Sequence, residues 1–283
     1  MPSVRDTHSF FLNTILLGGS NAEKIRAARD AGFVAVEVWT HDVDAQEGGA
    51  TALRGLLADN GLRALDYQVL RDFDGAPDER RQAARGRAER HLDVARELGA
   101  SMILVAASTD PDCVSERVVQ DLQWLADRAA ERSLTVAYES LSWSSLSPTL
   151  PEAWASVRDA DHEALGIVID PFHTFVRERT AADLDGIPVD KIFLVQLSDL
   201  VELVPEERLI ETARHHRVLP GDGIFDIHSV LARLLRDGYR GPIGLEVFND
   251  DMRADDPWLT SLRAVAALRA VVERAAPEAV PTG

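Results

Sequence analysis

Acidic and amide side chains recur where apolar, strand-like stretches of the sequence end. The stretches VAYES, GIVID, LVQLS and IGLEVF each carry one such residue, namely Glu139, Asp170, Gln196 and Glu246. A carboxylate in apolar surroundings is costly unless it is paired with a positive charge or bound to a metal. Three carboxylates and one amide oxygen form a ligand set that hard divalent cations such as Mg²⁺ or Mn²⁺ favour. We therefore predict a divalent-metal site built from these four residues.

The alternative is that each acid forms an ion pair with an Arg or Lys in the same cavity. That explanation is sufficient for any single acid, but it becomes less favourable when it must account for the whole set on four neighbouring strands. One shared cation accounts for the whole set. Gln196 is informative, because burying an unpaired amide costs about 1–3 kcal/mol, and a cation would bind its carbonyl oxygen.

Three basic residues are candidates for catalysis and substrate binding. His173 follows Asp170 by three residues in DPFHTF, and an imidazole beside a metal is a ready general acid or base. A structural hydrogen-bonding role is the alternative for this histidine. Arg71 in YQVLRDF and Arg217 in RHHRVLPGDG could bind an anionic substrate, because guanidinium groups form bidentate contacts with carboxylates. For each arginine the alternative is a surface salt bridge.

The elements that must position these residues are short apolar stretches alternating with longer amphipathic ones. Segments such as NAEKIRAARDAG and RHLDVARELGA have apolar residues at helical spacing and end in or near Gly, as helices often do. Eight strand–helix units in about 250 residues match a (β/α)₈ TIM barrel. A doubly wound sheet is the main alternative, but LLGGSNAEK lacks the glycine spacing of a dinucleotide-binding turn. The predicted strands cover residues 10–17, 34–39, 62–70, 101–108, 134–141, 165–172, 192–199 and 243–250.

We thus predict an α/β fold, with a single TIM barrel domain over residues 1–273 and a tail over 274–283. In such a barrel, functional groups gather at the carboxyl ends of the strands. The second and third predicted strands bring Glu37, Asp66 and Gln68 to that end, beside the four candidate metal ligands.

Composition narrows the class of partner. The chain has 283 residues, with 30 Lys and Arg against 47 Asp and Glu, and a formal charge of −17. Such a surface repels phosphate backbones and anionic lipids, so we expect neither nucleic acid nor a membrane as a partner. The single cysteine, Cys113, excludes an intrachain disulfide, and the N-terminus lacks a signal-peptide pattern. We expect a cytoplasmic protein and leave open whether it forms a homo-oligomer.

The strand-end residues, taken in their order along the chain, resemble those of the xylose isomerase-like barrel superfamily of sugar isomerases, epimerases and dehydratases. More narrowly, YQVLRDF, YESLSW, IDPFH, FLVQLSD, RHHRVLPGDG and LEVFND are similar to segments of the bacterial 3-dehydroshikimate dehydratases. The resemblance covers almost the whole chain. A Gln on the seventh strand is the specific clue, because many isomerases of the superfamily have His there.

That resemblance implies a lyase that converts 3-dehydroshikimate to protocatechuate with a divalent metal, Mn²⁺, Mg²⁺ or Co²⁺. His173 would remove a proton next to the ketone, and arginines would hold the substrate carboxylate. The implied metal ligands are Glu139, Asp170, Gln196 and Glu246, and the implied catalytic or substrate-binding residues are His173, Arg71, Arg217, Gln68 and Trp143.

The sequence departs from the dehydratase pattern after Trp143. Where those enzymes continue with Gly and polar residues, this chain has residues 144–148, SSLSP. The change leaves the metal ligands in place but affects the loop expected to line the substrate pocket. The alternatives to a dehydratase are a metal-dependent ketose or inosose isomerase or epimerase, in which Glu139 and Glu246 also carry protons, and a barrel that binds a ligand without chemistry. The −17 charge disfavours a DNA-repair endonuclease.

Overall fold

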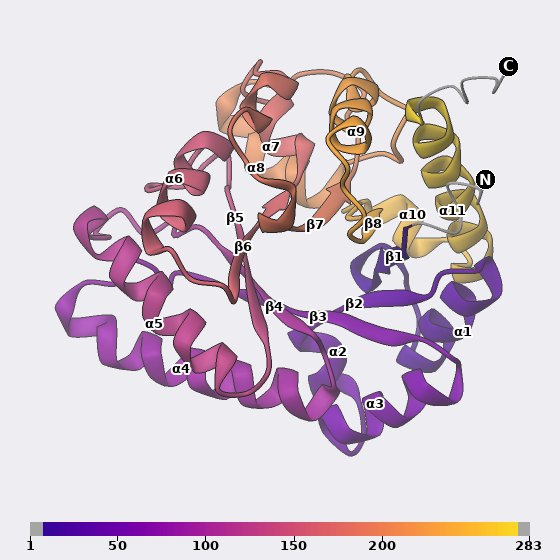
Figure 1. Cartoon of the computed structure of the whole chain (residues 1–283). Coiled ribbons are helices and arrows are strands. Elements are labelled where there is room, and N and C mark those ends of the chain that lie inside the picture. Colours follow the sequence, from indigo (N-terminus) through magenta and orange to yellow (C-terminus); the bar gives the residue numbers. More distant parts are fainter. Residues whose placement is uncertain (1–7, 277–283) are drawn as a thin grey trace, which may run out of the picture.

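Eight parallel strands form a closed barrel in sequence order, each pairing with the next and the last pairing with the first (Figure 1). The computed structural model describes residues 8–276. The predicted TIM barrel is confirmed, and every predicted strand is present. The strands are β1 (Phe10–Asn13), β2 (Ala35–Trp39), β3 (Arg63–Leu70), β4 (Met102–Ala106), β5 (Thr135–Glu139), β6 (Leu165–Ile169), β7 (Ile192–Leu197) and β8 (Ile243–Leu245).

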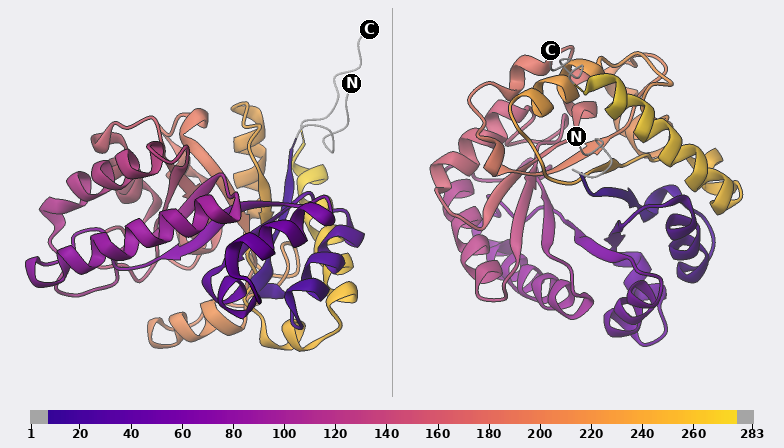
Figure 2. Two further views of the ribbon diagram at one scale, coloured as in Figure 1. Left: turned by 90° about the horizontal axis from the view of Figure 1, so that it is seen from below. Right: turned by 45° about the vertical axis from the view of Figure 1, so that its right-hand side comes forward.

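Helices surround the strands as an outer layer (Figure 2). The last helix, α11, packs against α1 and α9 and so covers the part of the barrel where β8 meets β1. No helix of residues 8–276 has the length and apolar character needed to cross a membrane. The α-helices are α1 (Asn21–Ala31), α2 (Thr40–Ala45), α3 (Gly49–Asp59), α4 (Asp78–Leu98), α5 (Val118–Ala130), α6 (Leu150–Ala160), α7 (Pro171–Phe175), α8 (Glu206–His215), α9 (Ile227–Arg236), α10 (Asp250–Ala254) and α11 (Pro257–Ala275).

Two ends of elements differ from the sequence prediction. The first predicted strand, 10–17, is extended only to Asn13, whose side-chain oxygen accepts a hydrogen bond from the backbone of Ile15 at 3.1 Å. That bond caps a 3₁₀ turn, η2 (Thr14–Leu16), which carries the chain away from the barrel. At the other end, α11 continues to Ala275, two residues into the predicted tail. Residues 277–283 of that tail lie outside the described part of the chain.

The barrel interior holds a compact apolar layer below the polar rim. Gly244 makes room for it, because a Cβ at this position would lie 2.4 Å from the ring of Phe11. The larger core lies between the strands and the outer helices. The interior layer comprises Phe11, Ala35, Leu65, Met102, Leu104, Ala137, Val168 and Leu194.

Candidate active site

Strand alternation places the candidate ligands inside the barrel. Side chains two residues apart on a strand point to the same face. Ala137, Val168 and Leu194 belong to the interior apolar layer, and the residues two positions further along are Glu139, Asp170 and Gln196. Gly244, against Phe11 in the interior, precedes Glu246 in the same way. The apolar layer therefore forms a floor, and the four polar residues lie directly above it, at the carboxyl ends of β5 to β8.

A continuous series of contacts joins the four predicted metal ligands. The Nε2 atom of His173 lies 3.8 Å from Glu139 Oε1 and 3.7 Å from Asp170 Oδ2. One nitrogen of Arg217, Nη1, lies 2.9 Å from Asp170 Oδ2 and 3.4 Å from Glu246 Oε2. Glu246 Oε1 in turn accepts a hydrogen bond from Gln196 Nε2 at 3.3 Å. Glu139, Asp170 and His173 also offer ligand atoms that all lie within 4.8 Å of one another.

The electrostatics of this cluster suit a divalent cation. Burial and neighbouring acids raise the pKa of Glu139 well above its usual range, and burial raises the pKa of Glu246 to about 7 although Arg217 opposes the shift. Glu139 Oε1 and Gln196 Oε1 are buried and have no hydrogen-bond partner among the described residues. Buried, unsatisfied oxygens of this kind are costly without a cation. The donor set therefore fits a hard divalent metal.

Arg217 is a basic partner of the kind that the ion-pair alternative requires, but it pairs with only two of the three acids, Asp170 and Glu246. Its guanidinium is buried, stacks over the ring of Phe172 at 4.1 Å, and contacts Asp170 and Glu246. Glu139 makes no ion pair with an Arg or Lys within residues 8–276. One guanidinium therefore leaves the site with an excess of acid. The role of Arg217 in binding substrate stays a prediction.

His173 is buried within the short helix α7, with its two ring nitrogens in different surroundings. The backbone N–H of Ser142 donates to Nδ1 at 3.1 Å, and Ser142 Oγ lies at the same distance from Nδ1. Nε2 has no hydrogen-bond partner among the residues that the structure describes, and it faces the acids. Burial, and the positive charge of Arg217, lower the pKa of His173 well below its usual value. The imidazole is therefore neutral at pH 7.

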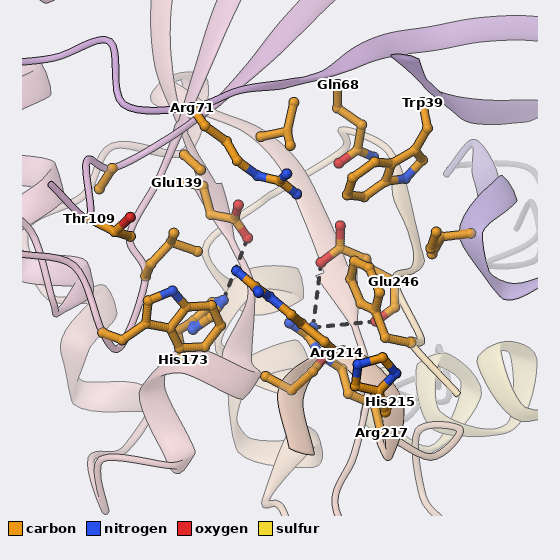
Figure 3. Close-up of a pocket in the computed structure, with 18 of the residues that line it drawn as sticks. Trp39, Gln68, Arg71, Thr109, Glu139, His173, Arg214, His215, Arg217 and Glu246 are labelled. Atoms are coloured by element: carbon orange, nitrogen blue, oxygen red, sulfur yellow. Dashed lines mark hydrogen bonds and ion pairs between the residues drawn. The ribbon is translucent and has the colours of Figure 1, made fainter. Parts of the chain in front are cut away.

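A pocket of about 240 Å³ opens above these acids, and Figure 3 shows its walls. Gln68, Arg71 and Trp143, three predicted substrate-binding residues, all line it, together with Glu139, His173, Arg217 and Glu246. The Arg71 guanidinium lies 5.6 Å from the Trp39 ring, and Trp143 meets His173 edge to face at 5.1 Å. The structure thus brings the predicted substrate-binding and catalytic residues around one cavity. Asp170 and Gln196 lie beneath it.

Comparison with known proteins agrees with this architecture. Residues 25–270 match the xylose isomerase-like TIM barrel family. This chain belongs to that family. A solved structure described as a xylose isomerase-like TIM barrel/4-hydroxyphenylpyruvate dioxygenase fusion protein superposes with a TM-score of 0.91 at 35% identity. The match covers 95% of this chain and 43% of that one.

Two curated relatives of this xylose isomerase-like barrel carry the same name. The 3-dehydroshikimate dehydratase of Pseudomonas putida is 38% identical over 85% of this chain and 38% of its own length. This chain therefore spans about two fifths of that relative. The 3-dehydroshikimate dehydratase of Neurospora crassa is 24% identical over 91% of this chain and 89% of its own length.

Several residues that line the pocket were not predicted from the sequence as site residues. Arg214 and His215, at the end of α8, line the cavity, as do Asn249 and Arg253 beside and within α10. Arg214 matters most, because neither it nor Arg71 forms an ion pair within the described part of the chain, and Figure 3 shows the two entering the pocket from opposite sides. The basic run RHHR was a visible signal, but only the fold shows which of its members face the cavity.

The altered loop after Trp143 is anchored away from the pocket. Ser144 Oγ donates to the carbonyl of Ser108 at 2.7 Å and accepts from the backbone of Leu146 and Ser147, each at 3.0 Å. The side chain of Leu146 packs against the hydrophobic core. None of residues 144–148 lines the cavity, whose wall on this side is formed by Leu141 and Trp143. The departure from the dehydratase pattern therefore leaves room for a cyclic substrate.

Asp74 is part of the hydrogen-bond network on this side of the pocket, and its surroundings lead us to predict that the stability of the folded protein depends on pH. The carboxylate of Asp74 accepts one hydrogen bond from the hydroxyl of Tyr138 at 2.7 Å and another from the backbone N–H of Ser108 at 3.1 Å. Burial nevertheless raises the pKa of Asp74 from 3.8 to about 6. The Asp74 carboxyl group therefore binds its proton more tightly in the folded state than in the unfolded state. The contribution of this proton to the free energy of unfolding is lost as the pH rises through about 6.

We expect Asp74→Asn to remove this dependence. The wild-type free energy of unfolding, measured relative to the variant by urea titration, should fall by about 1 kcal/mol between about pH 5.5 and pH 7.5. An unchanged difference between the two proteins over that range would contradict a raised pKa at Asp74.

Proposed function

We propose that this barrel is a divalent-metal-dependent hydro-lyase that converts 3-dehydroshikimate to protocatechuate. The observation that carries the proposal is the position of Arg71 and Arg214, which form no ion pair with a carboxylate within residues 8–276, over a rim of buried candidate oxygen ligands. The curated relatives support the choice of substrate. The Neurospora relative is pertinent because this chain covers most of its length, whereas it covers about two fifths of the Pseudomonas one. A cytoplasmic location is part of the proposal, supported by the free thiol of Cys113.

Glu139, Asp170, Gln196 and Glu246 would hold the cation. When bound, a divalent metal acts as a Lewis acid that makes the carbon next to a ketone more acidic. The protein contributes a dry cavity floor, which strengthens electrostatic interactions at the rim. The reaction removes one proton from carbon and one hydroxide, released together as water, and the resulting ring tautomerises to the aromatic catechol.

His173 is the proposed proton-transfer residue. Its neutral state leaves one ring nitrogen able to accept a proton. When Nδ1 carries the ring proton and donates it to Ser142 Oγ, Nε2 is free to take a proton from the substrate. When Nδ1 accepts from the Ser142 backbone, Nε2 carries the proton and can donate it to an oxygen of the substrate. The Ser142 hydroxyl can serve either tautomer, whereas the fixed backbone N–H of Ser142 favours the second, in which Nε2 carries the proton.

Arg71 and Arg214 are proposed to bind the substrate carboxylate. Burial lowers the pKa of Arg71, and the positive charge of Arg214 lowers it further. An anion between the two guanidinium groups would relieve that repulsion and form charge-assisted hydrogen bonds. A carboxylated ring therefore suits this pocket better than a neutral sugar.

We expect Arg71→Ala to raise KM by about tenfold to a hundredfold, with a smaller change in kcat, because a charge-assisted hydrogen bond contributes about 1.5–3 kcal/mol. Arg80→Ala is the matched control, since Arg80 is paired with Asp110 and Asp112 and does not line the cavity over the acids. Steady-state kinetics of both variants would decide. A loss confined to kcat would exclude carboxylate binding by Arg71.

The function is tested by incubating the protein with Mn²⁺ and 3-dehydroshikimate and following absorbance in the near ultraviolet, where a catechol product absorbs. Formation of protocatechuate that stops on chelation supports the proposal. No absorbance change, together with interconversion of ketoses or inososes, would favour an isomerase or epimerase.

A further inference from the structure

The amide of Gln196 is held by carboxyl groups that come from two other strands of the barrel, one on β2 and one at the end of β8. Its nitrogen, Nε2, donates to Glu37 Oε1 at 2.8 Å and to Glu246 Oε1 at 3.3 Å. All three side chains are buried. The amide oxygen, Oε1, has no partner within residues 8–276. Glu37 therefore makes the shorter contact with Gln196, although it belongs to β2 and is not among the predicted ligands.

These contacts fix which way the amide points. An amide has a donor end and an acceptor end, and carboxylate oxygens accept hydrogen bonds. If the Gln196 amide turned over, its oxygen would face Glu37 Oε1 and Glu246 Oε1, and neither hydrogen bond could form while these two oxygens carry no proton. Glu37 itself is constrained, because β2 pairs with β1 at Asn13 and the hydroxyl of Thr14 donates to the Glu37 carbonyl at 3.0 Å.

A second contact from the same region holds Glu246. Asn13 Nδ2 donates to Glu246 Oε1 at 3.1 Å, and the indole N–H of Trp39 donates to Asn13 Oδ1 at 2.6 Å. Strands β1 and β2 supply no predicted metal ligand, yet they bond to ligands from β7 and β8. Residues that orient metal ligands typically change metal affinity about 10- to 100-fold when replaced.

We propose that Glu37 is a positioning residue, which accepts the Gln196 amide N–H and thereby turns the Gln196 carbonyl oxygen toward the cation. The inference rests on the proposed role of Gln196 as a metal ligand. It assigns Glu37 a role in which the acceptor oxygen matters and the negative charge does not.

Two replacements of Glu37 distinguish the effect of its hydrogen-bond acceptor oxygen from the effect of its negative charge. Glu37→Gln keeps an oxygen that can accept from Gln196, and its own amide can donate to Asp66, whose carboxyl oxygens have no partner among the described residues. Glu37→Met has a similar length but offers no acceptor of comparable strength. Both variants remove a buried carboxyl group, so their effects on folding should be similar.

The readout is Mn²⁺ binding without substrate, measured by calorimetry and by the paramagnetic resonance signal of free Mn²⁺. We expect Glu37→Gln to bind nearly as tightly as wild type and Glu37→Met to bind about 10- to 100-fold more weakly. Melting temperatures of the metal-free proteins report folding. Equal affinities for Glu37→Met and wild type, or equal losses in the two variants, would overturn the positioning role.

A double-mutant cycle adds a measurement that a general structural role would not produce. If Glu37 acts through Gln196, Glu37→Met should not weaken Mn²⁺ binding further in a Gln196→Met background. Additive losses would overturn the inference even if each variant binds weakly. If wild-type protein binds no Mn²⁺, the cation site itself is refuted, and the proposed function fails together with this inference.

Discussion

Glu139→Gln is expected to weaken Mn²⁺ binding by at least about a hundredfold, because even residues that only orient ligands change affinity by about 10- to 100-fold. Turnover should fall by at least as much. Glu139 forms no ion pair with an Arg or Lys among residues 8–276, and its nearest basic group, His173, is neutral. The metal-free variant should also melt no lower than wild type, since the substitution removes a buried acid surrounded by other acids.

The combination of results distinguishes a metal ligand from a structural acid. Asp121→Asn is the matched control, because Asp121 is equally buried and pairs with Arg81 and Arg85 far from the rim. We expect this control to melt lower than wild type but to bind Mn²⁺ normally. Calorimetry and thermal melts with and without chelator measure both properties. A destabilised Glu139→Gln protein with normal Mn²⁺ affinity would refute the metal site.

His173→Ala is expected to lower kcat by about 10²–10⁴-fold, the usual contribution of a general acid or base. His173→Gln distinguishes the two uses of the ring, because glutamine can donate a hydrogen bond but cannot accept a proton at neutral pH. If His173 is the base, both variants should be equally slow. If its main use is donation from Nε2, the glutamine variant should recover much of the activity.

Steady-state kinetics at saturating Mn²⁺ make this comparison, with Mn²⁺ affinity measured in parallel because His173 lies beside two candidate ligands. Turnover in His173→Ala equal to that of wild type would remove His173 from the mechanism. His91→Ala is a suitable control, since His91 is partly buried but contacts Tyr67 and does not line the pocket.

Much of the architecture follows from local patterns in the sequence. Each apolar stretch predicted as a strand contains one, and Glu139, Asp170 and Glu246 lie where strands end. These features depend on alternation and burial within a few residues, which a sequence displays directly. The first strand was predicted too long because Asn13 bonds to its own following backbone, an effect that an apolar run conceals.

Long-range polar contacts could not be predicted in this way. Glu37 and Gln196 are 159 residues apart in the sequence, so no spacing rule connects them. Arg217 lines the pocket, and its guanidinium also contacts Asp170 and Glu246, a pairing that no sequence spacing indicates. Its role in substrate binding stays a prediction. Arg214, three residues earlier, lines the same pocket and was not predicted. Which arginine of a basic run faces a cavity depends on where α8 ends, and helix ends are the least predictable part of an element.

The contact between the first and last strands has a consequence for how the chain matures during translation. Glu246 follows β8, and its partner Asn13 ends β1, so the two meet only when the barrel closes. A nascent chain that has emerged from the ribosome only as far as β7 would carry the proposed ligands Glu139, Asp170 and Gln196 without the fourth proposed ligand, Glu246. Tight binding of metal would therefore require that the segment containing Glu246 has been synthesised, so shorter nascent chains would not retain cellular cations.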